Sequence, residues 1–404
     1  MKKNVIRIII IFIILILFVI LYFLIYSKNK TNEVIEIDNN DVVIINNKLN
    51  VFDEYKISDI ISINEGTILN NRVIDTNIIG EKLIEVFYLD RENVKKKAFA
   101  SINIVDDIKP TILGGSNYYI LKGSKLEIEY IVLSFDNYTS SPKREIIGNY
   151  NLDKIGKYNL TFKITDESGN ENTKDFTLNI ISKKTPIKSI TTKTFYDDIV
   201  KKHKNDSTMI GLDVSEWQGT IDFDKLKEKN VEFIFIRIGF QRGFKIDYVL
   251  DSKFERNIKE ANRVGIPVGL YFYSYATSKD IAKEQALWII ERIKDYKISL
   301  PIAFDFEDWS SFSKLNLSQR DINDIAISFI EVLEKQGYKG MNYSSKYYLE
   351  NIWNIEKYPT WLANYTSKTN YQGKYSVWQL CQDGRIDGIN GAVDINVMYD
   401  NLIY

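Results

Sequence analysis

The sequence is almost without cysteine and histidine, since its 404 residues contain one of each, Cys381 and His203. A single cysteine excludes an intrachain disulfide and any zinc or iron–sulfur site built from several thiolates. A single histidine excludes an HExxH metalloprotease and leaves one candidate base for a Ser-His-Asp triad. Walker A and GxGxxG sequences are also absent, which excludes the common phosphate-binding loops. We therefore predict no metal and no cofactor.

An excess of one charge is lacking too, because 53 lysines and arginines stand against 54 aspartates and glutamates, a net charge of −1. A chain balanced in this way has no overall attraction for nucleic acid, and we predict no nucleic-acid partner. Apolar residues are abundant at 45%, which is enough for large buried cores. At roughly 150 residues per domain, the length predicts two to three domains.

The longest hydrophobic run lies near the N-terminus, where every residue from Ile8 to Tyr26 is apolar or aromatic. As a helix this run is about 28 Å long, close to the ~30 Å hydrocarbon core of a bilayer. Lys2, Lys3 and Arg7 precede it, which favours a cytoplasmic N-terminus. The run is longer than a signal-peptide core, and no Ala-x-Ala cleavage pattern follows it. We predict that residues 1–30 form a cytoplasmic tip and a single-pass membrane anchor, with the later domains outside the cell.

Residues 31–182 alternate short apolar strands with polar turns and show no long helical period. A pattern repeats at an offset of 76 residues: Gly80 and Gly156 each precede a period-two strand, a polar turn and a second such strand. This repeat predicts two all-β sandwiches, over residues 31–105 and 106–182.

The second repeat contains two motifs that resemble bacterial surface immunoglobulin-like domains. They are Asp106-Asp107-Ile108-Lys109-Pro110 and the pattern IGxYxxxFxxxDxxGN, which runs from Ile155 to Asn170. The resemblance implies immunoglobulin-like sandwiches, which serve either as a spacer that holds the next domain away from the membrane or as a ligand-binding, adhesive module.

Residues 183–207 interrupt the strand pattern and are rich in lysine and threonine. This composition predicts a solvated linker, which could also contact anionic wall polymers or lipid headgroups. His203 lies between lysines within it, so we expect an exposed linker residue rather than a catalytic base.

From residue 208 to the C-terminus, apolar strands alternate with amphipathic helices, which is typical of a parallel α/β fold. We expect helices at about residues 250–264, 279–296 and 318–336, the last with Ser318 as its N-cap. The expected strands are residues 209–213, 233–238, 266–272, 300–305, 340–343, 360–363, 376–380 and 393–396. Eight strands with so few helices predict a compact (β/α) TIM-like barrel that lacks some outer helices.

Acidic residues recur where these strands end, which is the rim that carries the active site in such barrels. Asp213 ends the first strand, Asp305 and Glu307 follow the fourth, and Asp394 lies on the eighth. Because Asp305 and Glu307 are two residues apart on an extended segment, they point to the same side. Neighbouring carboxyl groups split their pKa values into an acid and a base or anion, as glycosidic cleavage requires. Asp308 beside them fits a solvated acid or a helix cap.

Seven short motifs lie in one order between residues 208 and 404. They are GLDVSEWQG from Gly211, RIG from Arg237, GLYFY from Gly269, AFDFE from Ala303, WLANY from Trp361, WQ from Trp378 and VDIN from Val393. Together they resemble glycoside hydrolase family 25, the Chalaropsis-type lysozymes (N-acetylmuramidases). The resemblance implies a flattened barrel that cleaves the β-1,4 bond between N-acetylmuramic acid and N-acetylglucosamine in peptidoglycan. It implies Glu307 as the general acid and Asp213, Asp305 and Asp394 as the other acids of the catalytic motif.

Two retaining mechanisms fit such a site. In the first, the substrate's own 2-acetamido oxygen attacks the anomeric carbon while Glu307 protonates the leaving oxygen and Asp305 holds the acetamido N–H. In the second, an aspartate attacks directly. We favour substrate assistance. Aromatic side chains that could stack on sugar faces are Trp217, Tyr271, Tyr343, Trp361, Tyr365 and Trp378.

The sequence thus predicts a membrane-anchored peptidoglycan hydrolase whose catalytic barrel spans residues 208–404. Two alternatives remain at this point. The barrel could be a silent wall-binding module, or the β-modules could form a surface adhesin with an accessory barrel.

Overall fold

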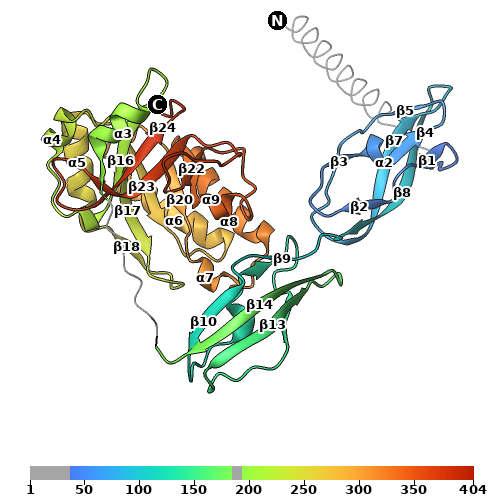
Figure 1. Cartoon of the computed structure of the whole chain (residues 1–404). Coiled ribbons are helices and arrows are strands. Elements are labelled where there is room, and N and C mark those ends of the chain that lie inside the picture. The colour runs from blue at the N-terminus through green and yellow to red at the C-terminus, as the bar shows by residue number, and fades with distance from the viewer. Residues whose placement is uncertain (1–36, 184–192) are drawn as a thin grey trace, which may run out of the picture. The chain divides into compact units, whose positions relative to one another are not determined.

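The computed structural model describes residues 37–183 and 193–404, in two compact units that divide between Asp107 and Ile108 (Figure 1). The predicted anchor over Ile8–Tyr26 lies outside the described residues. Within those two ranges, no helix is both long and apolar enough to cross a bilayer.

A long β-hairpin forms the centre of the first unit. Its strands β7 (Gly80–Leu89) and β8 (Lys95–Val105) pair antiparallel, with Gly80 opposite Ile104. Alternate side chains of the hairpin are buried, as their period-two pattern predicts. β2 runs parallel to β8 in the sheet β2-β8-β7-β5. The hairpin is accompanied by β1 (Val42–Ile44), β2 (Lys48–Asn50), β3 (Tyr55–Lys56), α2 (Ile57–Ile60), β4 (Ile61–Ile63), β5 (Thr67–Ile68) and β6 (Val73–Ile74).

The second unit begins with residues 108–183, here called the second β-module, which repeats this hairpin. Strands β13 (Gly156–Thr165) and β14 (Glu171–Ile181) pair with Gly156 opposite Ile180. Both positions lie 76 residues after their counterparts Gly80 and Ile104, which confirms the predicted repeat of the hairpin. The immunoglobulin-like identity of the two modules stays a prediction. The module also contains β9 (Thr111–Ile112), β10 (Asn117–Leu121), η1 (Ile128–Tyr130), β11 (Ser134–Phe135) and β12 (Lys143–Ile147).

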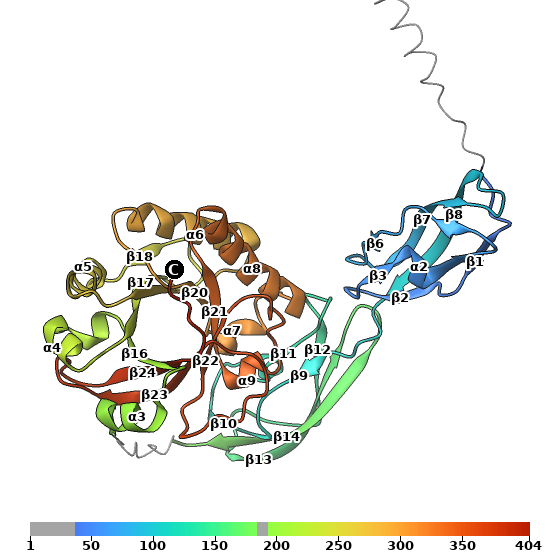
Figure 2. The ribbon, with the colours of Figure 1, turned by 90° about the horizontal axis from the view of Figure 1, so that it is seen from above.

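The C-terminal part forms a closed barrel of eight strands, as the sequence predicts (Figure 2). In spatial order they are β16 (Met209–Val214), β17 (Phe233–Gln241), β19 (Val268–Tyr273), β20 (Ile302–Asp305), β21 (Gly340–Ser345), β22 (Thr360–Ala363), β23 (Val377–Arg385) and β24 (Val393–Met398). Neighbours from β16 to β23 pair parallel, whereas β24 is antiparallel to both β23 and β16 and closes the ring. The prediction of a wholly parallel sheet is therefore wrong for the last strand. The seven residues between β23 and β24 form a hairpin connection, which is too short for a parallel crossover.

Helices cover the first half of the barrel and are sparse in the second. The three predicted helices correspond to α5 (Phe254–Val264), α6 (Lys279–Ile293) and α8 (Gln319–Lys335), and the Ser318 hydroxyl caps α8 by accepting from the Asp321 N–H at 3.1 Å. The described connections after β22 and β23 contain no helix, so outer helices are missing as expected. The shorter elements are η2 (Glu216–Gln218), α4 (Phe223–Glu228), β18 (Tyr248–Leu250), α7 (Trp309–Phe312) and α9 (Lys346–Leu349).

Part of the predicted linker is folded onto the barrel, which corrects the prediction for residues 193–207. There β15 (Thr194–Phe195) pairs parallel with β23, and α3 (Tyr196–His203) follows directly. Tyr196 and Ile199 fall on one face of α3 and are buried, while the lysines point outward. The charge-rich composition concealed this short amphipathic helix.

The second β-module packs against the barrel within the second unit. Phe135 of β11 lies edge-on to Phe312 of α7, with ring centroids 6.0 Å apart, and both side chains are fully buried. The Ser313 hydroxyl accepts from the Ser134 N–H at 3.1 Å and donates to the Val132 carbonyl at 3.2 Å.

The same module completes the N-terminus of α8. The first amides of a helix have no acceptor within the helix. Here the Gln319 N–H donates to the Asp136 carbonyl at 2.7 Å, and the Arg320 N–H donates to the Asn137 carbonyl at 3.2 Å. The module therefore supports the segment that follows Glu307, and is more than a spacer.

Phe135→Ala tests this packing. Removing a buried phenylalanine leaves a cavity between module and barrel, and we expect the free energy of unfolding to fall by about 3–5 kcal/mol. Thermal unfolding followed by circular dichroism measures the change. Tyr119→Ala in the same module removes an aromatic ring that is 63% exposed and should leave the melting temperature nearly unchanged. Equal melting temperatures for both variants would contradict the packing.

Candidate active site

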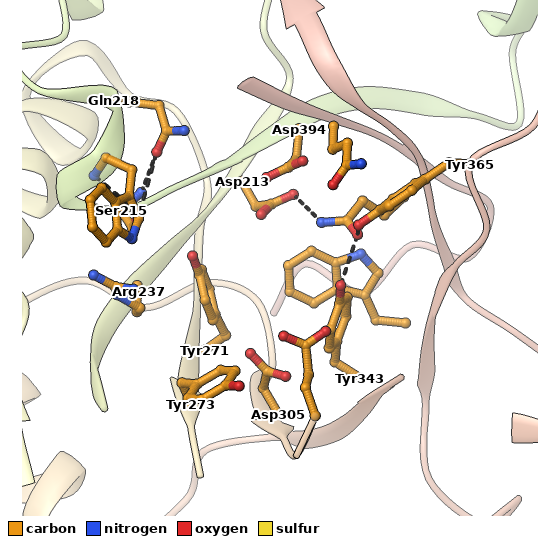
Figure 3. A pocket seen from close by; sticks show the side chains of 15 residues that line it. Asp213, Ser215, Gln218, Arg237, Tyr271, Tyr273, Asp305, Tyr343, Tyr365 and Asp394 are labelled. Carbon is orange, nitrogen blue, oxygen red and sulfur yellow. Dashed lines mark hydrogen bonds between the residues drawn. The ribbon is translucent and has the colours of Figure 1, made fainter. Parts of the chain in front are cut away.

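The four predicted acids converge at one rim of the barrel, where they line a cavity of about 340 Å³ (Figure 3). β16 and β20 end at this rim, where Asp213 is the last residue but one of β16 and Asp305 is the last residue of β20. Because β24 is antiparallel, it begins there instead, and its Asp394 lies directly opposite Asp213 in the ladder. Glu307 follows β20 by two residues and lines the same cavity. The structure therefore brings together all four residues that the sequence indicated.

Asp213 is buried and held by two side-chain amides. Asn396 Nδ2 donates to its Oδ2 at 2.7 Å, and Gln379 Nε2 donates to the same oxygen at 3.0 Å. Burial raises the pKa of Asp213 to about 6, although the two amides and a hydrogen bond with Asp394 counteract the rise by stabilising the anion.

Asp394 faces Asp213 across the ladder and shares a hydrogen bond with it. Burial raises the pKa of Asp394 to about 9, and the charges of Asp213 and Glu307 add to the rise. Asp394 therefore carries a proton at neutral pH and can donate it in the hydrogen bond to Asp213.

Asp305 and Glu307 form the second pair of acids. Asp305 is 3% exposed, and its Oδ1 has no hydrogen-bond partner among the described residues. Burial and the nearby Glu307 charge hold the pKa of Asp305 well above its usual range. Burial also raises the pKa of Glu307, with a contribution from the Asp213 charge. A carboxyl whose pKa is raised in this way can serve as a general acid near neutral pH.

Five of the six predicted aromatic residues line the cavity, and Trp361 forms part of its floor. Trp361 stacks on Phe235 with ring centroids 4.4 Å apart, and its indole N–H donates to Asn396 Oδ1 at 2.8 Å. Tyr343 packs against Trp361 at 4.9 Å. The remaining lining aromatics are Tyr271, Tyr365 and Trp217, of which Trp217 is 79% exposed.

Trp378 is the exception, and its placement corrects the sequence prediction. On β23 the side chains alternate, so Gln379 points into the cavity while Trp378 points outward and is buried beneath α3. Its ring lies 5.6 Å from that of His203, and its indole N–H donates to the Asn364 carbonyl at 2.8 Å. Trp378 is therefore a packing residue.

Gln379 is a residue that sequence reasoning did not select. Its Oε1 accepts from the hydroxyl groups of Tyr343 at 2.9 Å and Tyr365 at 3.1 Å, while its amide donates to Asp213. One amide thus orients two tyrosines and the Asp213 carboxyl group. Asn396 was missed in the same way, although it lies two residues after Asp394 and so shares its face of β24.

Arg237 and Tyr273 also line the cavity without having been predicted. Arg237 Nε donates to Asp251 at 2.8 Å and its Nη2 donates to Glu216 at 2.9 Å, so its charge is balanced from behind. Asp308, in contrast, accepts from the Ser311 N–H at 3.3 Å and caps α7, which confirms its prediction as a helix cap.

Comparison with known proteins identifies this part of the chain. Residues 212–389 match the family described as glycosyl hydrolases family 25. The YegX protein of Escherichia coli K12 is 28% identical over 195 residues, covering 47% of this chain and 69% of YegX. An autolytic lysozyme of Clostridium acetobutylicum is 26% identical over 198 residues, covering 48% of this chain and 57% of the lysozyme.

Two solved structures are similar as well. One is the modular autolysin LytC from Streptococcus pneumoniae in complex with a synthetic peptidoglycan ligand. Its identity to this chain is 26% and its TM-score is 0.44, and the match covers 59% of this chain and 56% of LytC. The other is a family 25 glycosyl hydrolase from Bacillus anthracis, with 25% identity and a TM-score of 0.42. The match covers 50% of this chain and 93% of that protein. The chain spans little more than half the length of the lysozyme and of LytC. The match of residues 212–389 to family 25 and the similarity to the autolytic lysozyme support a glycoside hydrolase of the lysozyme type.

The raised pKa of Asp394 predicts how stability depends on pH. An aspartate with a raised pKa in the folded state stabilises the fold fully below about pH 4, and this stabilisation is lost as the pH rises toward about 9. Asp394→Asn keeps a donor for Asp213 and does not titrate. We expect its melting temperature to match the wild type near pH 4 and to exceed it by about 4 °C or more at pH 8.5.

Differential scanning calorimetry across this pH range makes the measurement. Asp280→Asn, which changes an aspartate side chain that is 86% exposed, serves as the control and should follow the wild-type curve. Parallel curves for Asp394→Asn and the wild type would show that Asp394 is ionised in the folded protein.

Proposed function

We propose that this protein is a membrane-anchored peptidoglycan hydrolase that cleaves the β-1,4 bond between N-acetylmuramic acid and N-acetylglucosamine with retention of configuration. The observation that carries the proposal is the group of four carboxyl groups at one barrel rim, each with a raised pKa and each lining one cavity. Glycosidic cleavage needs an acid and an anion in one water-restricted site. The family match and the autolytic lysozyme relative support this substrate class.

Glu307 is the general acid of the proposed reaction. Its raised pKa keeps a larger fraction of the side chain protonated near neutral pH than an exposed glutamate would have. It protonates the glycosidic oxygen as the bond to the leaving N-acetylglucosamine breaks. After departure of this sugar, Glu307 is an anion and can take a proton from the attacking water.

Asp305 acts on the other side of the scissile bond. Asp305 lines the cavity beside Glu307, and in the proposed reaction its carboxyl group binds the substrate's acetamido N–H. Holding that group directs the acetamido oxygen toward the anomeric carbon. The positive charge that develops on the ring and the acetamido group then favours the Asp305 anion.

Asp213 and Asp394 together determine the charge on their side of the cavity. The two amides on Asp213 and the proton of Asp394 confine one negative charge to this side of the cavity. That charge stabilises the cationic transition state and raises the pKa of Glu307.

The location outside the cell is supported by the apolar run Ile8–Tyr26 and the basic residues that precede it. The β-modules between anchor and barrel then lie between the membrane and the wall. The proposed reaction requires that the enzyme and its glycan substrate lie on the same side of the membrane.

Glu307→Gln tests the assignment of the acid. Glutamine keeps the size and hydrogen-bonding shape of the side chain but cannot protonate the leaving oxygen, and we expect a loss of about 10²–10⁴-fold in the release of reducing ends from peptidoglycan. Asp305→Asn should also be severe, because an amide cannot become the anion that the developing positive charge favours. Asp308→Asn preserves the cap of α7 and is the matched control. Wild-type turnover by Glu307→Gln at an unchanged melting temperature would refute the assignment.

The anchor is tested in the cell that makes the protein. We expect the protein to remain in the membrane fraction after washing at high salt, since an apolar helix is held by the hydrophobic effect and not by charge. Protease added to wall-stripped cells should remove the barrel. Mature protein recovered from the medium with an N-terminus near Ser27 would contradict the anchor.

A further inference from the structure

A second cavity, of about 670 Å³, adjoins the catalytic one. The two share Tyr365 and Gln382 in their linings, so they are neighbours on one face of the barrel. Thr194, Lys202 and His203 contribute its far wall. These residues lie before residue 212, where the match to family 25 begins. β15 and α3 thus extend the catalytic cleft beyond the family domain.

Two cationic side chains line this second cavity, Lys202 and Arg385. Lys202 Nζ donates to the Ser367 carbonyl at 2.9 Å, and Arg385 Nη1 donates to the carbonyls of Asp383 at 2.9 Å and Gly384 at 2.8 Å. These hydrogen bonds hold both cationic groups in place, and because the carbonyl groups are uncharged, they leave the positive charges unneutralised. In the part of the chain that the structure describes, neither cation lies within ion-pair distance of a carboxylate.

The rest of the lining contains both polar and apolar residues. Asp383 contributes one negative charge and accepts from the Thr194 hydroxyl at 2.9 Å. Burial and the neighbouring Lys202 lower the pKa of His203, which favours its neutral form at pH 7. The apolar lining residues are Ile199, Leu380, Cys381 and Ala392. The cavity therefore suits a ligand that combines carboxylate groups with small aliphatic side chains.

We infer that this second cavity binds the acidic peptide that branches from the muramic acid sugar, so that the enzyme recognises peptide-bearing glycan. The inference rests on the proposed function and adds a specificity site to it. The peptide of peptidoglycan is attached to the lactyl group of the muramic acid, the sugar whose C1 carries the scissile bond, and it has free carboxylates and small aliphatic residues. A cavity that shares two lining residues with the catalytic one lies where such a branch leaves the glycan strand.

The test compares two substrates with the full chain. One is intact peptidoglycan, and the other is glycan strands from the same wall stripped of peptide by an amidase. We expect Lys202→Gln and Arg385→Gln each to raise KM for peptide-bearing wall by about three- to tenfold, since each removes one charge-assisted contact. kcat should stay unchanged, and KM for the stripped strands should change less than twofold.

Lys201→Gln is the matched control, because it removes a lysine of the same helix that pairs with Asp198 and does not line the cavity. Arg385→Lys keeps the charge and should recover most of the lost affinity. Since Arg385 also bonds to its own strand, a folding defect of Arg385→Gln would leave the decision to Lys202→Gln, which changes an exposed side chain.

The outcomes separate the two proposals. Equal changes of KM on both substrates, or no change on either, would overturn the peptide site while leaving the hydrolase proposal intact. Failure of the wild-type chain to cleave either substrate would refute the proposed function itself. A KM increase confined to the peptide-bearing wall would support the inference.

Discussion

The arrangement of this enzyme depends on one structural constraint, the antiparallel insertion of β24 between β16 and β23. A parallel last strand would start at the opposite end of the barrel and finish at this rim. Because Asp394 is the second residue of β24, such a strand would place it far from the other acids. Because β24 runs in reverse, Asp394 lies opposite Asp213 and Asn396 lies within reach of the same carboxylate. The short connection after β23 enforces this direction. The pairing of β24 with β16 and β23 therefore closes the barrel and also brings Asp394 and Asn396 into the site.

Four carboxyl groups meet at one rim, and two of them, Asp213 and Asp305, are buried residues. Desolvation opposes ionisation of all four, and the negative charges of Asp213 and Glu307 raise the pKa of neighbouring acids. Two features reduce the repulsion between these acids. Gln379 and Asn396 stabilise an anion on Asp213, and a protonated Asp394 removes one negative charge. The second β-module supports the chain after Glu307 through Phe312, Ser313 and the first turn of α8. The acid site is thus held by hydrogen bonds to Asp213 and by the packing of the second β-module.

Much of this architecture is readable from the sequence, because strands buried on both faces appear as apolar runs with acids at their ends. The spacing of Asp305 and Glu307 alone indicates a shared face. The direction of β24 is not readable, since a strand's pattern is the same in either direction. Trp378 illustrates a further limit: the period of two was available, but choosing which of Trp378 and Gln379 faces inward requires the register. Helix α3 was missed because lysines dominate a segment whose buried face consists of few residues.

Burial keeps a proton on part of this cluster of carboxyl groups at neutral pH. Infrared difference spectroscopy of the folded enzyme measures this directly through the C=O stretch of protonated carboxyl groups during a pH titration. We expect a carboxylic acid band that persists above pH 7 and loses the contribution of Asp394 near its pKa of about 9. Complete loss of that band by pH 5, with the enzyme still folded, would contradict this expectation.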